Sequence, residues 1–305
     1  MQLPLTNQDI TKTLGRPVGS PILISNLQEL KLEQAALLEF FSPLFSELSW
    51  DYYDVKRLQV EFLIKAFPEA TQKINAILKD YYTGKTDIQI LQPWINKLSI
   101  EDRYTFDKIL PWRRRSVCQF IYNSNPACII RKKVPQFSQA VESNDLRSWP
   151  RIFEESPAAH VQNHLFYNLL LAVKNIVQAV SKQPVNKLEI TAHFMSVMAR
   201  PEQPGDNSPE GAHEDGADFI ISALVINRIN LTGGESQIIE LRDNNKKEII
   251  ARHILQPGEF VFQADSKDEL VYGTDLWHHV TLFHKTNERG PDAWRDIIGF
   301  DINII

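Results

Sequence analysis

The sequence has few of the features that would place a protein in a membrane, outside the cell or on nucleic acid. No apolar run approaches the roughly 18 residues that a membrane-spanning helix needs. Only two cysteines are present, Cys118 and Cys128, and no export signal is recognisable at the N-terminus, which favours reduced thiols and a cytoplasmic location. The formal net charge of −5 at pH 7 disfavours nucleic acid as the main partner.

What remains is the composition of a globular protein, with 43% hydrophobic and 23% charged residues in a chain of 305. Residues 1–25 contain three prolines among polar residues and are expected to be irregular. From residue 26 to residue 110, apolar side chains recur mainly at helical spacing. We therefore predict a mainly helical N-terminal region over residues 1–150, whose role as a lid, a pocket wall or an oligomer interface is left open.

Residues 151–305 are predicted to form a long helix followed by a β-rich core. The helix is expected at 156–181, where apolar residues recur at helical spacing. Short segments with alternating or β-branched residues then follow, separated by Gly, Pro and Asn turns. The predicted strands are 187–199, 218–227, 235–242, 248–254, 259–263, 276–283 and 296–304. This spacing is typical of an antiparallel barrel or a double-sheet jelly roll.

A basic run, Trp112-Arg113-Arg114-Arg115, lies in the N-terminal region. We interpret it as a solvated or salt-bridged patch, with contact to an anionic ligand as the alternative.

One segment pairs a histidine with a carboxylate at the spacing of a strand. His213 is the only histidine with an acidic residue two positions later, Asp215. Because residues i and i+2 point to the same face of a strand, both side chains could reach one metal ion. A third ligand would have to come from a later strand. The candidates are His253, His278 or its neighbour His279, and His284.

Four blocks of sequence carry a resemblance to a known family. They are P-E-G-A-H-E-D-G at 209–216, N-R-I-N-L-T-G-G-E-S at 227–236, L-W-H-H-V-T at 276–281 and W-R-D-I-I-G-F-D-I at 294–302. In this order they resemble the iron(II)/2-oxoglutarate dioxygenases related to bacterial L-isoleucine hydroxylase. The resemblance implies an α+β fold with a double-stranded β-helix (jelly-roll) core and a helical N-terminal part.

The same resemblance implies roles for individual residues. His213 and Asp215 match the paired metal ligands of the second barrel strand. The distal histidine matches His278, and His279, at a position where the family usually has glycine, stays the alternative. Arg295 matches the arginine that holds the far carboxylate of 2-oxoglutarate, with Arg289 as its rival.

The implied cofactors are iron(II), 2-oxoglutarate as cosubstrate, and dioxygen. The implied reaction is hydroxylation of an unactivated C–H bond in a small molecule, a free amino acid or a close derivative. Two alternatives are desaturation or cyclisation of a natural-product intermediate by the same cofactors, and a non-catalytic jelly-roll binding protein. A halogenase is disfavoured, because related halogenases have a small residue where this chain has Asp215.

Overall fold

The computed structural model describes residues 5–134, 149–181, 184–242, 246–265 and 275–305. Packing divides the chain into two compact units. The first unit combines the segments 1–48, 115–134 and 154–305, and the second combines 49–114 with 135–153. The division of the chain at residue 150 remains a prediction.

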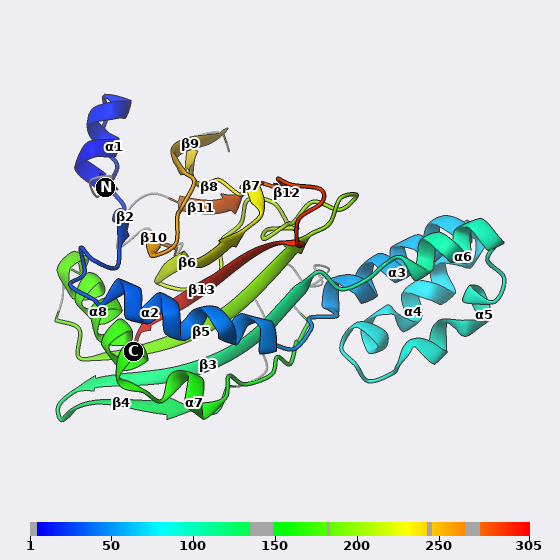
Figure 1. The fold of residues 1–305 in the computed structure, drawn as a ribbon, viewed down its shortest axis with the longest axis horizontal. Helices are drawn as coiled ribbons and strands as arrows, with labels where there is room; N and C mark the ends of the chain where they lie inside the picture. The colour runs from blue at the N-terminus through cyan, green and yellow to red at the C-terminus, as the bar shows by residue number, and fades with distance from the viewer. Residues whose placement is uncertain (1–4, 135–148, 182–183, 243–245, 266–274) are drawn as a thin grey trace. The chain divides into compact units, whose positions relative to one another are not determined.

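The first unit is built on an eight-stranded sheet, within the described residues, with the strand order β1-β2-β10-β6-β13-β5-β3-β4 (Figure 1). Its inner ladders, β2–β10, β10–β6, β6–β13 and β13–β5, are antiparallel. The strands are β1 (Leu5–Thr6), β2 (Ile22–Asn26), β3 (Arg113–Ser124), β4 (Ala127–Lys132), β5 (Lys187–Ala199), β6 (Phe219–Ile229), β10 (Glu259–Ala264) and β13 (Ala293–Ile304).

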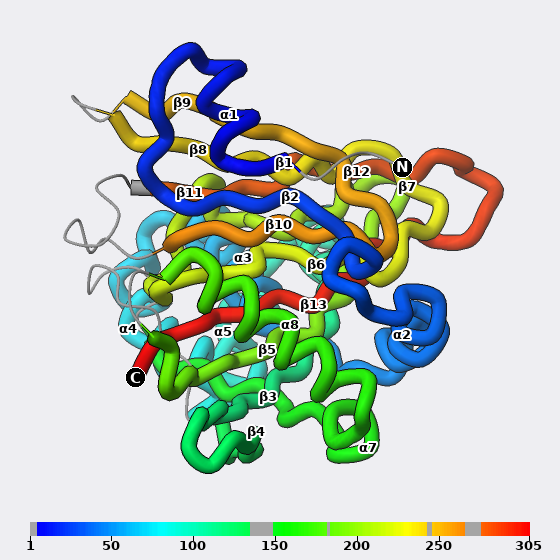
Figure 2. The backbone as a smooth tube through the Cα atoms, turned by 90° about the vertical axis from the view of Figure 1, so that its left-hand side faces the viewer, coloured from blue at the N-terminus to red at the C-terminus, as the bar shows by residue number. Residues whose placement is uncertain are grey.

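Two smaller sheets complete the β-core. One has the order β11-β8-β9, with β8 (Ser236–Arg242), β9 (Lys246–His253) and β11 (Asp275–Val280), and the other pairs β7 (Leu231–Gly233) with β12 (Phe283–Lys285). In Figure 2, β8, β9 and β11 run beside β2 and β10. Side chains of the large sheet and of the three-stranded sheet meet in one apolar cluster, which includes Val225, Ile238 and Ile297. The predicted α+β class with a jelly-roll core is confirmed.

Helices cover the other face of the large sheet (Figure 1). The helical elements of this unit are α1 (Asn7–Leu14), α2 (Gln34–Phe41), the 3-10 helix η1 (Ser42–Glu47), α7 (Ala158–Val161) and α8 (His164–Val180). Phe166 of α8 is fully buried, and its ring centroid lies 5.6 Å from that of Phe120, 5.8 Å from that of Phe194 and 6.0 Å from that of Phe41. This aromatic cluster ties α2 and α8 to the sheet.

The long helix starts later than residue 156, where the sequence analysis expected it. The short helix α7 ends at Val161, and the extended backbone of Asn163 (φ −139°, ψ 165°) precedes the next helix. The side-chain oxygen of Asn163 accepts a hydrogen bond from the Phe166 amide at 3.0 Å. This N-cap begins a new helix at His164.

The second unit is helical. Its elements are α3 (Tyr53–Ala66), η2 (Pro68–Ala70), α4 (Thr71–Tyr82), η3 (Ile88–Leu91), α5 (Gln92–Ile95) and α6 (Ile100–Asp107), packed around Leu63, Ile74 and Phe106. Arg113 is buried, and its guanidinium pairs with Asp51 and Asp54. The salt-bridged interpretation of the basic run is therefore confirmed for Arg113.

Three further points of local structure differ from the sequence analysis. Residues 1–25 are not irregular throughout, because Thr6 and Asp9 form a capping box that starts α1. The strand β3 was missed, and its burial does not alternate, since it contains two runs of three consecutive buried residues. The predicted strand 276–283 ends at Val280, and after Leu282 the chain enters β12 in a different sheet.

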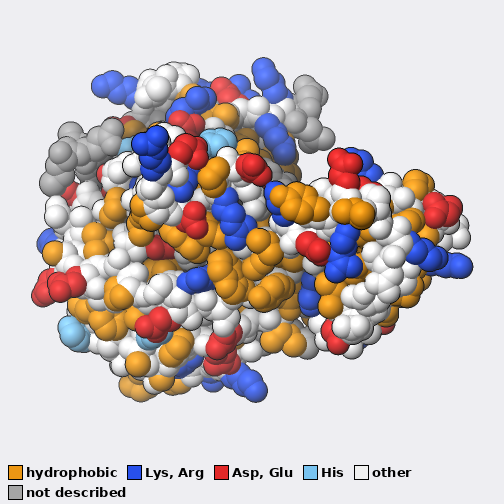
Figure 3. Space-filling model, turned by 45° about the vertical axis from the view of Figure 1, so that its right-hand side comes forward, with side chains coloured by type: hydrophobic (Ala, Val, Ile, Leu, Met, Phe, Trp, Pro, Cys, Tyr) orange, Lys and Arg blue, Asp and Glu red, His pale blue; other side chains and the backbone are white. Residues whose placement is uncertain are grey.

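Charged side chains of both signs are interspersed among the described residues on the face drawn in Figure 3. Within the described residues, none of the helices has both the length and the apolar character to cross a bilayer.

We expect Phe166→Ala to lower the free energy of unfolding by about 3–5 kcal/mol, because it leaves a cavity among three packed aromatic rings. Leu171→Ala on the same helix is the matched control, since Leu171 is 42% exposed and should change stability by no more than about 0.5 kcal/mol. Urea denaturation followed by circular dichroism measures both. Equal losses would mean that the cluster does not anchor α8.

Candidate metal centre

Two backbone hydrogen bonds bring a loop and a strand of the small sheet together. The loop between β5 and β6 carries His213, and β11 carries His278. The amide of His213 donates to the carbonyl of His278 at 3.1 Å, and the amide of His278 donates back at 3.0 Å. This isolated antiparallel bridge places the two imidazole centroids 4.2 Å apart.

Asp215 completes a converging group of three donors. Its Oδ1 lies 3.5 Å from Nε2 of His213, and its Oδ2 lies 3.4 Å from Nε2 of His278. One ligand atom from each residue lies within 4.8 Å of the others. Two imidazole nitrogens and one carboxylate oxygen are the donor set of the facial triad that holds non-haem iron(II). The chemistry of these residues therefore fits such an ion.

The neighbouring histidine lies elsewhere. Nδ1 of His279 lies 3.3 Å from Oε1 of Gln237 on β8, so its ring is directed away from His213. Adjacent strand residues face opposite sides, and the structure brings His278 to His213 and Asp215. His253 pairs with Glu259, and His284 is exposed on β12.

His213 and Asp215 do not share a regular strand, in contrast to the expectation from their spacing. Asp265, at the end of β10, explains the difference. Its buried carboxylate accepts hydrogen bonds from the amides of Asp215, Gly216 and Ala217, the closest at 2.7 Å. The backbone there bonds to a side chain instead of a neighbouring strand, and Gly216 adopts a positive φ of 86°.

Asp265 also lies near the third member of the group. Its Oδ1 is 3.9 Å from Nδ1 of His278, a nitrogen that has no hydrogen-bond partner among the described residues. Asp265 was missed by the sequence analysis. Its contacts span about fifty positions of the chain, and no local pattern marks them.

A second missed carboxylate is that of Glu210. Its Oε1 lies 3.1 Å from Nε2 of His213, the nitrogen that also faces Asp215. Two carboxylates therefore compete for one imidazole nitrogen in this structure. The ring is fixed from its other side, where Nδ1 lies 2.9 Å from the carbonyl oxygen of Gly211.

The electrostatics of the centre follow from burial and proximity. Burial disfavours the charged form of His213, but Asp215 and Glu210 outweigh it and raise its pKa to about 9. Burial, reinforced by His213, lowers the pKa of His278 to about 4. Burial acts to raise the pKa of Asp215, but His278 and His213 reverse this and lower it. Burial and the nearby Asp215 raise the pKa of Asp265 to about 8.

Arg295 lies on β13, fully buried on the face of the sheet that also carries Ile297. Its Nε, Nη1 and Nη2 have no hydrogen-bond partner among the described residues. Burial, followed by repulsion from Arg228, lowers its pKa to about 9, so it remains charged near neutral pH. The rival Arg289 is exposed in the loop after β12.

The next residue along β13 shows how this fold satisfies a buried charge. Asp296 points to the opposite face and accepts hydrogen bonds from the Ser196 hydroxyl and, at 2.7 Å, from the Asn227 side chain. A buried guanidinium without such partners is costly. Arg295 is therefore suited to bind an anion supplied from outside the chain.

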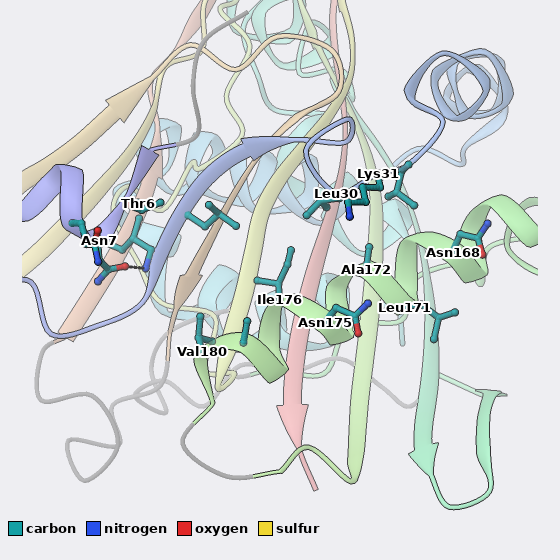
Figure 4. Close-up of a pocket in the computed structure, with 15 residues that line it drawn as sticks. Thr6, Asn7, Leu30, Lys31, Asn168, Leu171, Ala172, Asn175, Ile176 and Val180 are labelled. Carbon is teal, nitrogen blue, oxygen red and sulfur yellow. Dashed lines mark hydrogen bonds between the residues drawn. The ribbon is translucent and has the colours of Figure 1, made fainter.

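A groove of about 770 Å³ lies away from these residues. Figure 4 shows it between α8, with Asn175 and Ile176, and the segment after β2, with Leu30. Neither the converging donors nor Arg295 line it. The groove is therefore separate from the candidate metal centre.

The model of a family described as 2OG-Fe dioxygenase matches residues 93–301, more than half of the chain. The structure of a BsmA homologue from Methylobium petroleophilum PM1 is similar in fold, with a TM-score of 0.59 and 16% identity over 98% of this chain and 87% of that one. IDO from Bacillus thuringiensis has a TM-score of 0.49 and 17% identity, over 63% of this chain and 78% of that one. The Fe(II)/(alpha)ketoglutarate-dependent dioxygenase TqaL has a TM-score of 0.47 and 15% identity, over 82% of this chain and 89% of that one. No protein with a curated description matches the sequence.

We expect Asp265→Ala to weaken divalent metal binding by about 10- to 100-fold, because the loop that carries Asp215 loses the acceptor of three backbone hydrogen bonds. Anaerobic titration with cobalt(II), followed by its visible absorption, measures the affinity. Glu259→Ala is the matched control, since it removes a β10 carboxylate whose hydrogen bonds among the described residues go to His253 and Gln256, away from the candidate centre. Unchanged metal affinity in Asp265→Ala would contradict the positioning role.

Proposed function

Because the chain belongs to the 2OG-Fe dioxygenase family, we propose that it hydroxylates an unactivated C–H bond of a free amino acid or a close derivative. The chain is a 2-oxoglutarate-dependent iron dioxygenase, with iron(II) as cofactor and 2-oxoglutarate and dioxygen as cosubstrates. The proposed amino acid substrate is supported by the four sequence blocks that resemble the isoleucine hydroxylase group.

The observation that carries the proposal is the convergence of Nε2 of His213, a carboxylate oxygen of Asp215 and Nε2 of His278. These three residues would hold the iron(II) ion. When bound, iron(II) and 2-oxoglutarate supply the oxidising chemistry, in which dioxygen is consumed, the cosubstrate becomes succinate and carbon dioxide, and one oxygen atom enters the C–H bond.

The chain's own residues bind and orient the reactants. Arg295 would bind the distal carboxylate of 2-oxoglutarate, because its planar guanidinium can donate two parallel hydrogen bonds to a carboxylate. The surrounding jelly-roll interior is apolar, with Val225, Ile238 and Ile297 in one cluster. Such an environment excludes water and strengthens these charge-assisted contacts.

Succinate release in the presence of each common amino acid tests the proposed function. We expect at least one free amino acid to stimulate succinate release and to gain one oxygen atom, as measured by mass spectrometry. A product that lacks two hydrogen atoms instead would indicate desaturation. Stimulation by none of them would remove the amino acid assignment and leave the family chemistry in place.

Two adjacent variants control this assay. His278→Ala should abolish the substrate-dependent release, because it removes one of three ligands. His279→Ala should retain most of it, since that ring faces Gln237. The opposite pattern would mean that His279 supplies the third ligand.

Arg295→Ala should raise the Michaelis constant for 2-oxoglutarate by the equivalent of about 2–5 kcal/mol, because a buried charge pair loses one partner. Arg295→Lys should recover only part of this, since an ammonium group lacks the planar fork. Arg289→Ala is the control, and its exposed side chain should leave the constant unchanged. A rise in Arg289→Ala alone would assign the cosubstrate anchor to Arg289.

A further inference from the structure

A second arginine lies directly opposite Arg295. In the ladder between β13 and β6, Arg295 pairs with Arg228. Residues directly opposite each other in an antiparallel ladder project their side chains to the same face. Two cationic groups therefore share one region at the edge of the jelly-roll interior.

One glycine borders both side chains. A Cβ atom built on Gly234 would lie 3.5 Å from Cδ of Arg295 and 3.6 Å from Nη1 of Arg228. The Arg228 guanidinium thus lies close to the stem of Arg295, without an intervening side chain at position 234. Repulsion between the two arginines contributes to the lowered pKa of Arg295, in agreement with this proximity.

Neither guanidinium forms a salt bridge within the part of the chain that the structure describes. Nη2 of Arg228 donates to the carbonyl of Gly233 at 2.7 Å, whereas its buried Nη1 has no hydrogen-bond partner there. Bringing two cations together away from water is unfavourable, and an anion bound beside both would offset that cost. The pair is therefore suited to bind one negative group.

We infer that Arg228 is the second guanidinium of the 2-oxoglutarate site, and that Nη1 of Arg228 and the fork of Arg295 bind the same distal carboxylate. This inference rests on the proposed role of Arg295. The alternative ligand of Arg228 is the carboxylate of an amino acid substrate. The structure favours the shared carboxylate, because Arg228 lies directly opposite Arg295 in the ladder and its Nη1 is buried without a hydrogen-bond partner among the described residues.

The test compares two cosubstrates that differ only at the far end of the molecule. 2-Oxoglutarate carries the distal carboxylate, and 2-oxovalerate ends in a methyl group instead. Each is titrated anaerobically into the iron(II)-loaded protein, and the visible charge-transfer band reports binding without turnover. The proteins are the wild type, Arg228→Ala, Arg228→Lys, Arg295→Ala and the exposed control Arg289→Ala.

We expect Arg228→Ala to weaken 2-oxoglutarate binding by about 10- to 100-fold and to leave 2-oxovalerate binding unchanged, since only the first compound loses a charge-assisted hydrogen bond. The affinity of Arg228→Lys for 2-oxoglutarate should lie between those of the wild type and Arg228→Ala. The affinity of Arg289→Ala should match that of the wild type.

Three other outcomes overturn the inference. Equal weakening of both compounds would give Arg228 a structural role only. Unchanged 2-oxoglutarate binding, with a raised Michaelis constant for the amino acid substrate, would assign Arg228 to that substrate. If Arg295→Ala leaves 2-oxoglutarate binding intact, the proposed anchor itself fails, whatever Arg228→Ala does, and this separates the two failures.

Discussion

The candidate centre depends on a pair of backbone hydrogen bonds between His213 and His278. They join the loop between β5 and β6 of the large sheet to β11 of the three-stranded sheet. The two layers of the jelly roll are therefore connected at this point. Because both bonds are made by backbone atoms, the fold itself holds the two histidine backbones side by side, and their imidazole centroids lie 4.2 Å apart. The carboxylate of Asp265 accepts hydrogen bonds from the amides of residues 215–217, and in this position the Asp215 carboxylate lies close to both rings. The three donors therefore converge through contacts made by the chain itself.

The second constraint is the cost of burying charge. β13 carries two adjacent buried ionisable residues, Arg295 and Asp296, which differ in their hydrogen bonding. Asp296 faces the helices and has its hydrogen bonds from Ser196 and Asn227. Arg295 faces the jelly-roll interior and has no such partners among the described residues. A polar group whose only role is structural is normally satisfied by the fold. An unsatisfied guanidinium beside Arg228 is therefore the arrangement that the proposed binding of a carboxylate would require.

Much of the fold could be predicted from the sequence because its elements have strong local signals. The strands from β5 onwards alternate or are rich in β-branched residues, and Gly, Pro and Asn separate them, so the expected ranges lie close to the observed ones. The miss at β3 has a physical reason: its arginines suggested a solvated surface, yet Arg113 is buried by its pairing with Asp51 and Asp54. The predicted strand 276–283 is interrupted after Val280 for a different physical reason. The chain changes there from pairing with β8 to pairing with β7, and such a change depends on partner strands far away in the sequence.

For the candidate site, the sequence by itself determined which donor types are available and that His278 and His279 must face opposite sides. The resemblance carried by the four blocks predicted Arg295 as the carboxylate anchor, with Arg289 as its rival. Only the tertiary structure decided which histidine faces inwards, because the two-residue period of a strand leaves its phase open until a partner strand and a buried face are known. Asp265 and the pairing of Arg228 with Arg295 likewise emerged only in three dimensions, since each joins residues that lie tens of positions apart and belong to different strands or loops.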